Sequence, residues 1–155
     1  MPYQSSIITQ LRHDATFAWF LRDGAEYNPN YRKKQLDGLD DRLNGYLRCL
    51  VLTETQGEPM LSRIPLHDWG AVYTVAYISI ITDNESTFHN AVDAVAKEEQ
   101  SRELSHALRN FSFETVTPFI NHIAHHTNPW VQVAVIRAVG HHFDEINPDW
   151  LLPHL

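Results

Sequence analysis

Two adjacent amphipathic patterns between residues 114 and 146 constrain the fold more than any other feature of the chain. Apolar residues recur at the three- and four-residue spacing of a helix face, first over 116–124 and again over 131–143. Asn128-Pro129 separates the two patterns and is typical of a helix start, with asparagine as the N-cap and proline at the first helical position. The sequence therefore predicts two short helices packed back to back.

The same start signal occurs at Thr117-Pro118 and at Asn147-Pro148. If each begins a helix, Pro118 to Pro148 defines a helix-turn-helix period of 30 residues, which lies in the range of stacked helical repeats. We therefore expect the C-terminal part of the chain to be built from repeated antiparallel helix pairs.

The N-terminal part predicts a helical hairpin. A first helix, capped by Ser5 or Ser6 and running to about Tyr27, is apolar around most of its circumference, so we expect it to be packed on more than one side. A second helix over 33–52 carries one leucine-rich seam with charged residues on its other faces. Residues 53–65 contain glycine and prolines and predict a loop.

The middle of the chain predicts three more helical segments. Asp68 can cap a helix over 69–80, which is rich in β-branched residues but has helical length and spacing. Two further apolar stripes lie over 88–95 and 104–111. On one straight helix they would point to opposite sides, so a single helix cannot bury both against the same neighbour. We expect a break near Gln100-Ser101, with Ser101 as the cap.

The predicted fold is all-α in a single domain, with an N-terminal hairpin over 1–55 and HEAT-like antiparallel helix pairs over 66–155. A new apolar stripe begins at Trp150, and the sequence stops five residues later at Leu155. A stack ending there leaves a repeat half-built, whereas solenoids need a polar cap. We expect the chain to be the N-terminal segment of a longer protein.

Composition restricts the partners and the compartment. Twelve basic and nineteen acidic residues give a formal net charge of −7, which disfavours nonspecific binding to nucleic acid or an anionic membrane and favours a basic partner. Cys49 is the single cysteine, so no internal disulfide can form, and we expect its side chain to be buried. No signal peptide or membrane-spanning run is visible, so we expect a cytoplasmic protein.

Two parts of the chain resemble known helical proteins. The helix after Asn128-Pro129, with Arg137 near its middle, is similar to the second helix of HEAT repeats. The front of the chain resembles an uncharacterised bacterial family with HEAT-like repeats, often encoded beside type VI secretion effectors. The resemblance covers residues 7–52 and, more weakly, 113–155. The stretches that carry it are Phe20-Leu-Arg-Asp-Gly-Ala, Pro29-Asn-Tyr and Leu36-Asp-Gly-Leu-Asp-Asp-Arg-Leu-Asn-Gly-Tyr-Leu.

This resemblance implies a non-enzymatic protein-binding module, in particular an immunity protein that neutralises a co-encoded toxin. Acidic residues grouped on two of the predicted helices would contact a basic toxin, and a nuclease fits because carboxylates can occupy a phosphate-binding cleft. These candidate partner-binding residues are Asp37, Asp40, Asp41, Glu98, Glu99 and Glu103.

Ten histidines keep a metal-dependent hydrolase open as an alternative. His122 and His126 are one turn apart if one helix carries both, a spacing that zinc can use. The glutamate of a His-Glu-x-x-His motif is absent, because Ile123 follows His122. We therefore predict no metal, no cofactor and no catalytic residue. A scaffold or adaptor protein without inhibitory activity remains a third interpretation.

Overall fold

The described residues form seven α-helices. The computed structural model describes residues 2–56, 61 and 64–146. Its helices are α1 (Pro2–Glu26), α2 (Lys33–Gln56), α3 (Ala71–Ile81), α4 (Glu85–Asp93), α5 (Glu98–Arg109), α6 (Phe113–Ile123) and α7 (Pro129–His141), followed by the 3-10 turn η2 (Phe143–Glu145). The described residues contain no β-strand, and the all-α prediction is confirmed.

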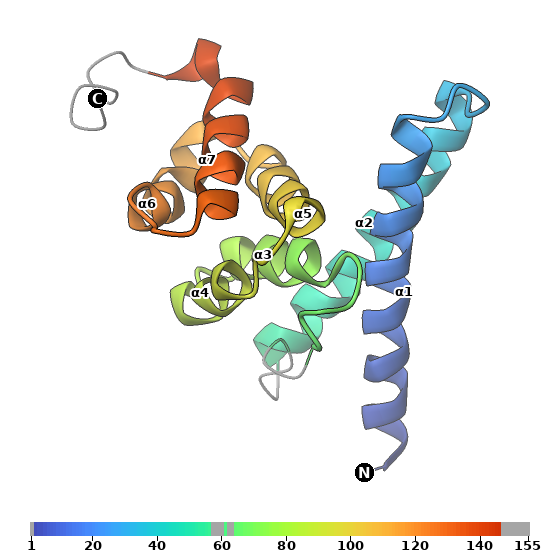
Figure 1. The fold of residues 1–155 in the computed structure, drawn as a ribbon. Helices are drawn as coiled ribbons and strands as arrows, with labels where there is room; N and C mark the ends of the chain where they lie inside the picture. The colour runs from blue at the N-terminus through green and yellow to red at the C-terminus, as the bar shows by residue number, and fades with distance from the viewer. Residues whose placement is uncertain (1, 57–60, 62–63, 147–155) are drawn as a thin grey trace.

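Helices α1 and α2 form the predicted hairpin and lie side by side along one edge of the molecule (Figure 1). The leucine seam explains the pairing, because Leu43, Leu47 and Leu50 are buried while the charged faces of α2 remain in solvent. Both helices are longer than predicted. Helix α1 begins at Pro2 rather than after Ser5 or Ser6, and α2 runs four residues past Leu52, to Gln56.

Helix α3 lies at the centre of the fold, in contact with α1, α2, α4, α5 and α6. It is apolar on every side, and nine of its eleven residues are buried, so the choice of helix over strand is confirmed. The predicted N-cap is wrong. The N-cap is Gly70, with φ of 79°, and Asp68 lies two residues earlier in the preceding turn.

The predicted break within residues 85–111 exists, but it lies earlier than expected. Helix α4 ends at Asp93 and α5 begins at Glu98, so Ser101 is inside α5 and is not a cap. The turn between α4 and α5 is held by a residue that is distant in sequence: the Asn128 side chain donates to the Val95 carbonyl at 2.5 Å. The Ser101 hydroxyl instead donates to the Trp130 carbonyl at 2.7 Å and ties α5 to α7.

Asn128 caps α7 as predicted and accepts a hydrogen bond from the Trp130 amide at 2.9 Å. The start at Thr117-Pro118 is wrong, because α6 begins at Phe113 with Ser112 as its N-cap and carries Pro118 in its interior. The proposed 30-residue period therefore loses its first anchor. Its second anchor, Asn147-Pro148, and the apolar stripe beginning at Trp150 lie outside the described residues.

One cluster of buried apolar side chains runs from α1 to α7. Helix α5 lies between α7 and the hairpin (Figure 1) and contacts both α3 and α7. On the other side of α3, Phe88 of α4 packs edge-on against Phe119 of α6, with ring centroids 4.9 Å apart. Helices α1 and α2 cover one remaining side of the core.

Two burial predictions are wrong. Helix α1 is packed on one side only: Ala15, Ala18 and Trp19 are buried, whereas Phe17 on the opposite face is 59% exposed. Cys49, expected in the core, is exposed on α2. Apolar periodicity identifies which residues share a face, but it does not show what covers that face.

Candidate functional site

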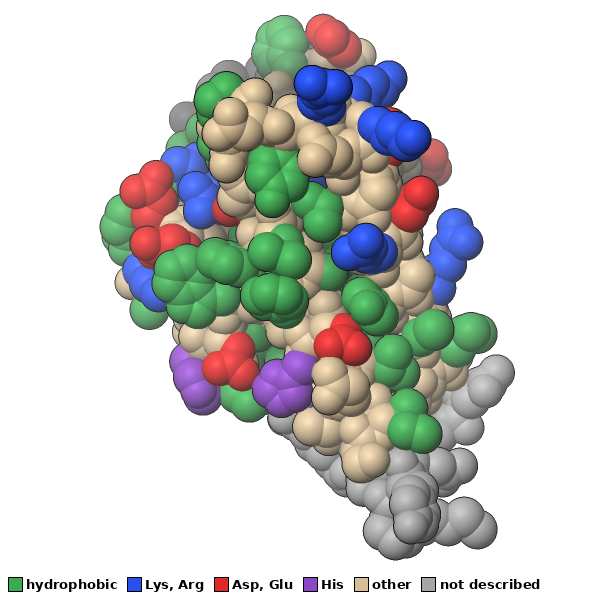
Figure 2. Space-filling model, turned by 90° about the vertical axis from the view of Figure 1, so that its right-hand side faces the viewer, with side chains coloured by type: hydrophobic (Ala, Val, Ile, Leu, Met, Phe, Trp, Pro, Cys, Tyr) green, Lys and Arg blue, Asp and Glu red, His purple; other side chains and the backbone are tan. Residues whose placement is uncertain are grey.

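A continuous hydrophobic patch lies on the open face of α1. It consists of Phe17, Phe20 and Leu21 together with Trp69 from the turn before α3. Trp69 is 57% exposed, and the Phe20 ring stands edge-on to it at 5.1 Å and lies 6.4 Å from Phe17. Figure 2 shows hydrophobic side chains gathered across the middle of this face, with acidic and basic side chains at its left edge and lysine or arginine side chains along its upper and right parts. Contiguous exposed aromatic residues of this kind mark interaction surfaces.

The backbone around Gly70 fixes Trp69 against α1. A Cβ at Gly70 would lie 2.4 Å from the Thr16 carbonyl oxygen, so only glycine permits this close approach between the turn and α1. The positive φ of Gly70 requires glycine for a second reason. The patch is therefore assembled from two segments by a rigid contact.

Two sets of carboxylates lie on α2 and α5. Asp37, Asp40 and Asp41 lie in the N-terminal half of α2, after its first turn, and Asp40 accepts a hydrogen bond from Arg22 of α1 at 2.8 Å. Glu98 and Glu99 form the first turn of α5, directly after Lys97, whose ammonium lies 5.4 Å over the Trp69 ring. Glu98 also pairs with Arg137 of α7 at 3.3 Å. Five of the six predicted acidic residues are thus at least partly exposed, and Asp40 among them contacts α1 directly.

Glu103, the sixth predicted acidic residue, is not on a solvated face. Its side chain is buried, at 2% exposure, and accepts the backbone N–H groups of Gly70 at 3.0 Å and of Tyr73 at 3.3 Å. It therefore caps the N-terminus of α3 from another helix. Burial raises the pKa of Glu103 to about 7, and these hydrogen bonds offset part of that rise. A residue in this position cannot meet a partner directly.

A buried ion pair connects the hairpin to α5. Asp23 of α1 lies 3.0 Å from Arg102, and its carboxylate is almost fully enclosed. Burial raises the pKa of Asp23, and the Arg102 charge opposes the rise. His106 stands 3.8 Å from the other oxygen of Asp23, too far for a hydrogen bond. Burial lowers the pKa of His106 to about 4, so the imidazole is neutral at pH 7.

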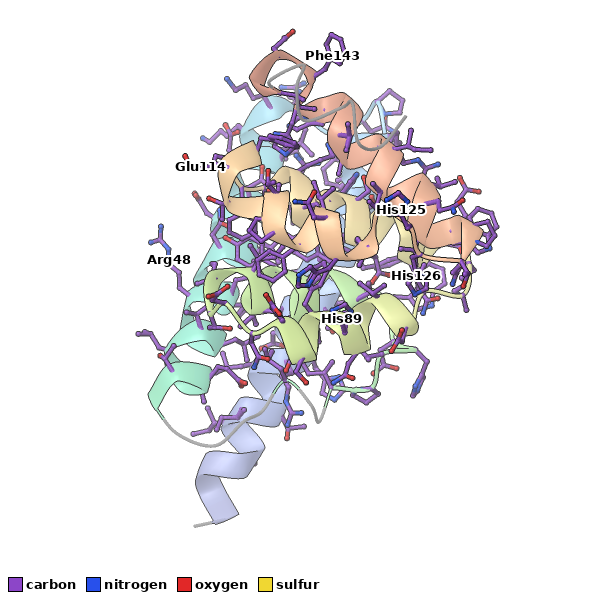
Figure 3. The ribbon with its side chains drawn as sticks, turned by 90° about the vertical axis from the view of Figure 1, so that its left-hand side faces the viewer. Arg48, His89, Glu114, His125, His126 and Phe143 are labelled. Carbon is purple, nitrogen blue, oxygen red and sulfur yellow. The ribbon has the colours of Figure 1, made fainter. Side chains whose placement is uncertain are left out.

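The described histidines lie on several different elements. Helix α6 ends at Ile123, so one helix does not carry both His122 and His126 as predicted. Figure 3 shows His125 and His126 at the end of α6 and His89 on α4; the His89 ring stacks on His122 at 5.8 Å. Among the described residues, no group of three or more histidine, cysteine, aspartate or glutamate side chains is arranged to hold a metal ion.

Comparison with family models, with curated proteins and with solved structures found no match to this chain. Within the part of the chain that the structure describes, no helix combines the length and the apolar character needed to cross a bilayer.

The hydrophobic patch is the feature that the sequence reasoning missed. A helix that is apolar around most of its circumference predicts packing on more than one side, yet Phe17, Phe20 and Leu21 lie on the open face of α1. The available signal was the surplus of large apolar residues in α1, more than a single partner helix can cover. Trp69 carried no such signal, because only the fold places it beside Phe20.

Proposed function

We propose that this chain is a non-enzymatic protein-binding module whose contact surface is the open face of α1. The observation that carries the proposal is the hydrophobic patch, in which Phe17 and Trp69 each keep more than half of their surface in solvent. Tryptophan and phenylalanine are enriched at the centres of protein interfaces, where burial of large rings supplies most of the binding energy.

The partner that fits this surface is a basic protein. One acidic set lies in the N-terminal half of α2 and the other in the first turn of α5, and the whole chain carries a formal net charge of −7. We call these two sets the acidic margin; together with the hydrophobic patch they suit a partner that has an apolar anchor beside lysine or arginine residues. The acidic margin would mainly speed association, while the patch would slow dissociation.

We further propose that the partner is a co-encoded type VI secretion toxin and that the chain is its immunity protein, with a nuclease favoured. The resemblance of residues 7–52 to the bacterial family encoded beside type VI secretion effectors supports a toxin as the partner. The acidic margin supports a partner with a phosphate-binding cleft. A HEAT-like arrangement is part of this proposal. Its support is that α5 contacts both α3 and α7, while α4 packs on α6 through Phe88 and Phe119.

The first experiment co-purifies the chain with the product of the adjacent gene and asks whether it rescues cells that express that product. Binding with rescue is expected. Binding without rescue would refute inhibition and leave a scaffold, whereas the absence of binding would refute this partner. An interface of roughly 1,600 Å² in total is expected for a stable complex.

The second experiment tests the surface. The Phe17→Ala and Trp69→Ala variants should each weaken binding at least about tenfold, because each removes a ring from the centre of the contact. Ile136→Ala is the matched control, since Ile136 is 70% exposed but lies on α7. Equal affinity for all three variants would place the contact elsewhere on the molecule.

The acidic margin is tested by charge reversal. Asp41→Lys and Glu99→Lys should slow association in low salt, and the effect should shrink as salt is raised. An association rate that does not change at low salt would remove these positions from the interface.

A further inference from the structure

A cavity of about 420 Å³ opens where the hairpin meets α5, away from the hydrophobic patch. Side chains of α1, α2, α3, α5 and α7 line it, and most of them are polar or charged. Its volume falls in the range of small-molecule sites. Charged groups at polar junctions between helices usually form ion pairs. The groups in this cavity that lack a counterion therefore indicate which charges a ligand would supply.

The hairpin side of the cavity carries more negative charge than positive. Arg22 is bound to two carboxylates at once: its Nε donates to Asp40 at 2.8 Å and its Nη1 to Glu26 at 2.5 Å. One guanidinium therefore serves two acidic groups, and both acidic side chains line the cavity. This side has an unbalanced negative charge that favours a cation.

The α5 side of the cavity carries a cation without a counterion. Arg109 lines the cavity, but no carboxylate of the described residues forms an ion pair with it, and its buried Nε has no hydrogen-bond partner. Tyr73 stands nearby as a hydrogen-bond donor. Its hydroxyl oxygen accepts from the Asn110 side chain at 3.1 Å, and burial raises the pKa of the hydroxyl, which therefore keeps its proton.

We propose that this cavity binds a small dipolar ligand of the α-amino acid class. The ligand's carboxylate would pair with Arg109 and accept from the Tyr73 hydroxyl, and its ammonium would lie against Glu26 and Asp40. The charges of the two arginines and the two carboxylates cancel overall, but the excess negative and the excess positive charge lie on different sides of the cavity. A dipolar ligand therefore fits, whereas a simple anion or cation would be repelled by one side. This site shares Asp40 with the acidic margin, but none of its lining residues belongs to the hydrophobic patch.

The binding experiment uses the full chain and two readouts, isothermal titration calorimetry and the shift of the unfolding midpoint. The probes are the twenty standard amino acids at millimolar concentration, followed by the N-acetyl and α-amide derivatives of the best binder. At least one amino acid should bind and raise the midpoint, and blocking either end should weaken binding about tenfold or more. No binding by any amino acid would overturn the proposal. An N-acetyl derivative that binds as tightly as its parent would overturn the ammonium contact.

The variants assign the two ends. Arg109→Gln should weaken binding of the amino acid about tenfold or more, and Glu26→Gln should weaken it while leaving the affinity for the N-acetyl form unchanged. Arg137→Gln is the control, because Arg137 is a partly exposed arginine of α7 that does not line the cavity. Circular dichroism verifies that each variant is folded. Binding that is unaffected by both cavity substitutions would show that the ligand lies elsewhere.

Discussion

Glu103 shows how one buried carboxylate can specify where a helix begins. Helix α3 lacks a side-chain cap of its own, because glycine precedes it. The N–H groups at its start are satisfied instead by Glu103, about thirty residues later in the chain. Burial disfavours the charged form of the carboxyl group more than these hydrogen bonds favour it, so its pKa rises to about 7.

This raised pKa predicts a pH dependence of stability. Folding takes up a proton between the ordinary pKa of 4.5 and the folded value of about 7, so the free energy of unfolding should fall as pH rises through this window. The loss should reach on the order of 2–3 kcal/mol by pH 8. Glu103→Gln has no proton to lose, so urea denaturation at pH 5 and pH 8 should show less loss in this variant than in the wild type. Asp41→Asn, at an exposed site on α2, should follow the wild type. Parallel behaviour of the Gln variant and the wild type would contradict the assignment.

Gly70 is the second residue on which local geometry depends. In Gly70→Ala the new Cβ would meet the Thr16 carbonyl oxygen, and the positive φ would add about 1–2 kcal/mol of backbone strain. We expect the free energy of unfolding to fall by at least that amount in urea denaturation. Gly45→Ala is the matched control: nothing lies within 4 Å of its Cβ position inside α2. It should stabilise the protein by roughly 0.5–1 kcal/mol. Equal effects at both sites would refute the close contact.

At the scale of elements, local patterns located the helices well. Amphipathic spacing predicted the seam of α2, segment length and residue spacing predicted the helical state of α3, and the Asn128-Pro129 signal predicted the start of α7. The turn between α4 and α5 could not be placed, since it contains neither glycine nor proline. Its position depends on the Asn128 side chain, which reaches it from more than thirty residues away.

Local patterns predicted the wrong structure where contacts elsewhere in the fold override them. Thr117-Pro118 has the form of a helix start, yet Ser112 caps α6 first and leaves Pro118 inside the helix. Glu103 lies among charged neighbours in the sequence, which predicts a solvated side chain. In the fold, however, the start of α3 covers it. The candidate site was predictable only in part. Its acidic members could be listed, but neither the hydrophobic patch nor the cavity forms until segments distant in sequence meet.

At the scale of the whole molecule, the hairpin is attached to the rest of the fold by a polar contact as well as an apolar one. The pair Asp23–Arg102 crosses from α1 to α5, beside Trp19, whose ring stacks on Tyr73 at 5.4 Å. Removing one partner of such a pair leaves a buried charge, which costs more than the pair itself contributes.

The prediction for this contact is that Arg102→Met lowers the free energy of unfolding by about 2–3 kcal/mol, less than for a fully enclosed pair because Arg102 is 35% exposed. Adding Asp23→Asn should recover part of the loss, as measured in a double-mutant cycle. Arg137→Met breaks an exposed pair with Glu98 and should change stability by no more than about 0.5 kcal/mol. Additive effects of the Asp23 and Arg102 substitutions would contradict the coupling.

The open face of α1 has a consequence for the protein when it is alone. Phe17 and Trp69 are each more than half exposed and therefore hydrated, and any surface that covers them releases that water. A second copy of the chain offers such a surface, so crowding of identical molecules should promote self-association. Any protein that binds the open face of α1 would therefore compete with a second copy of the chain for the same surface.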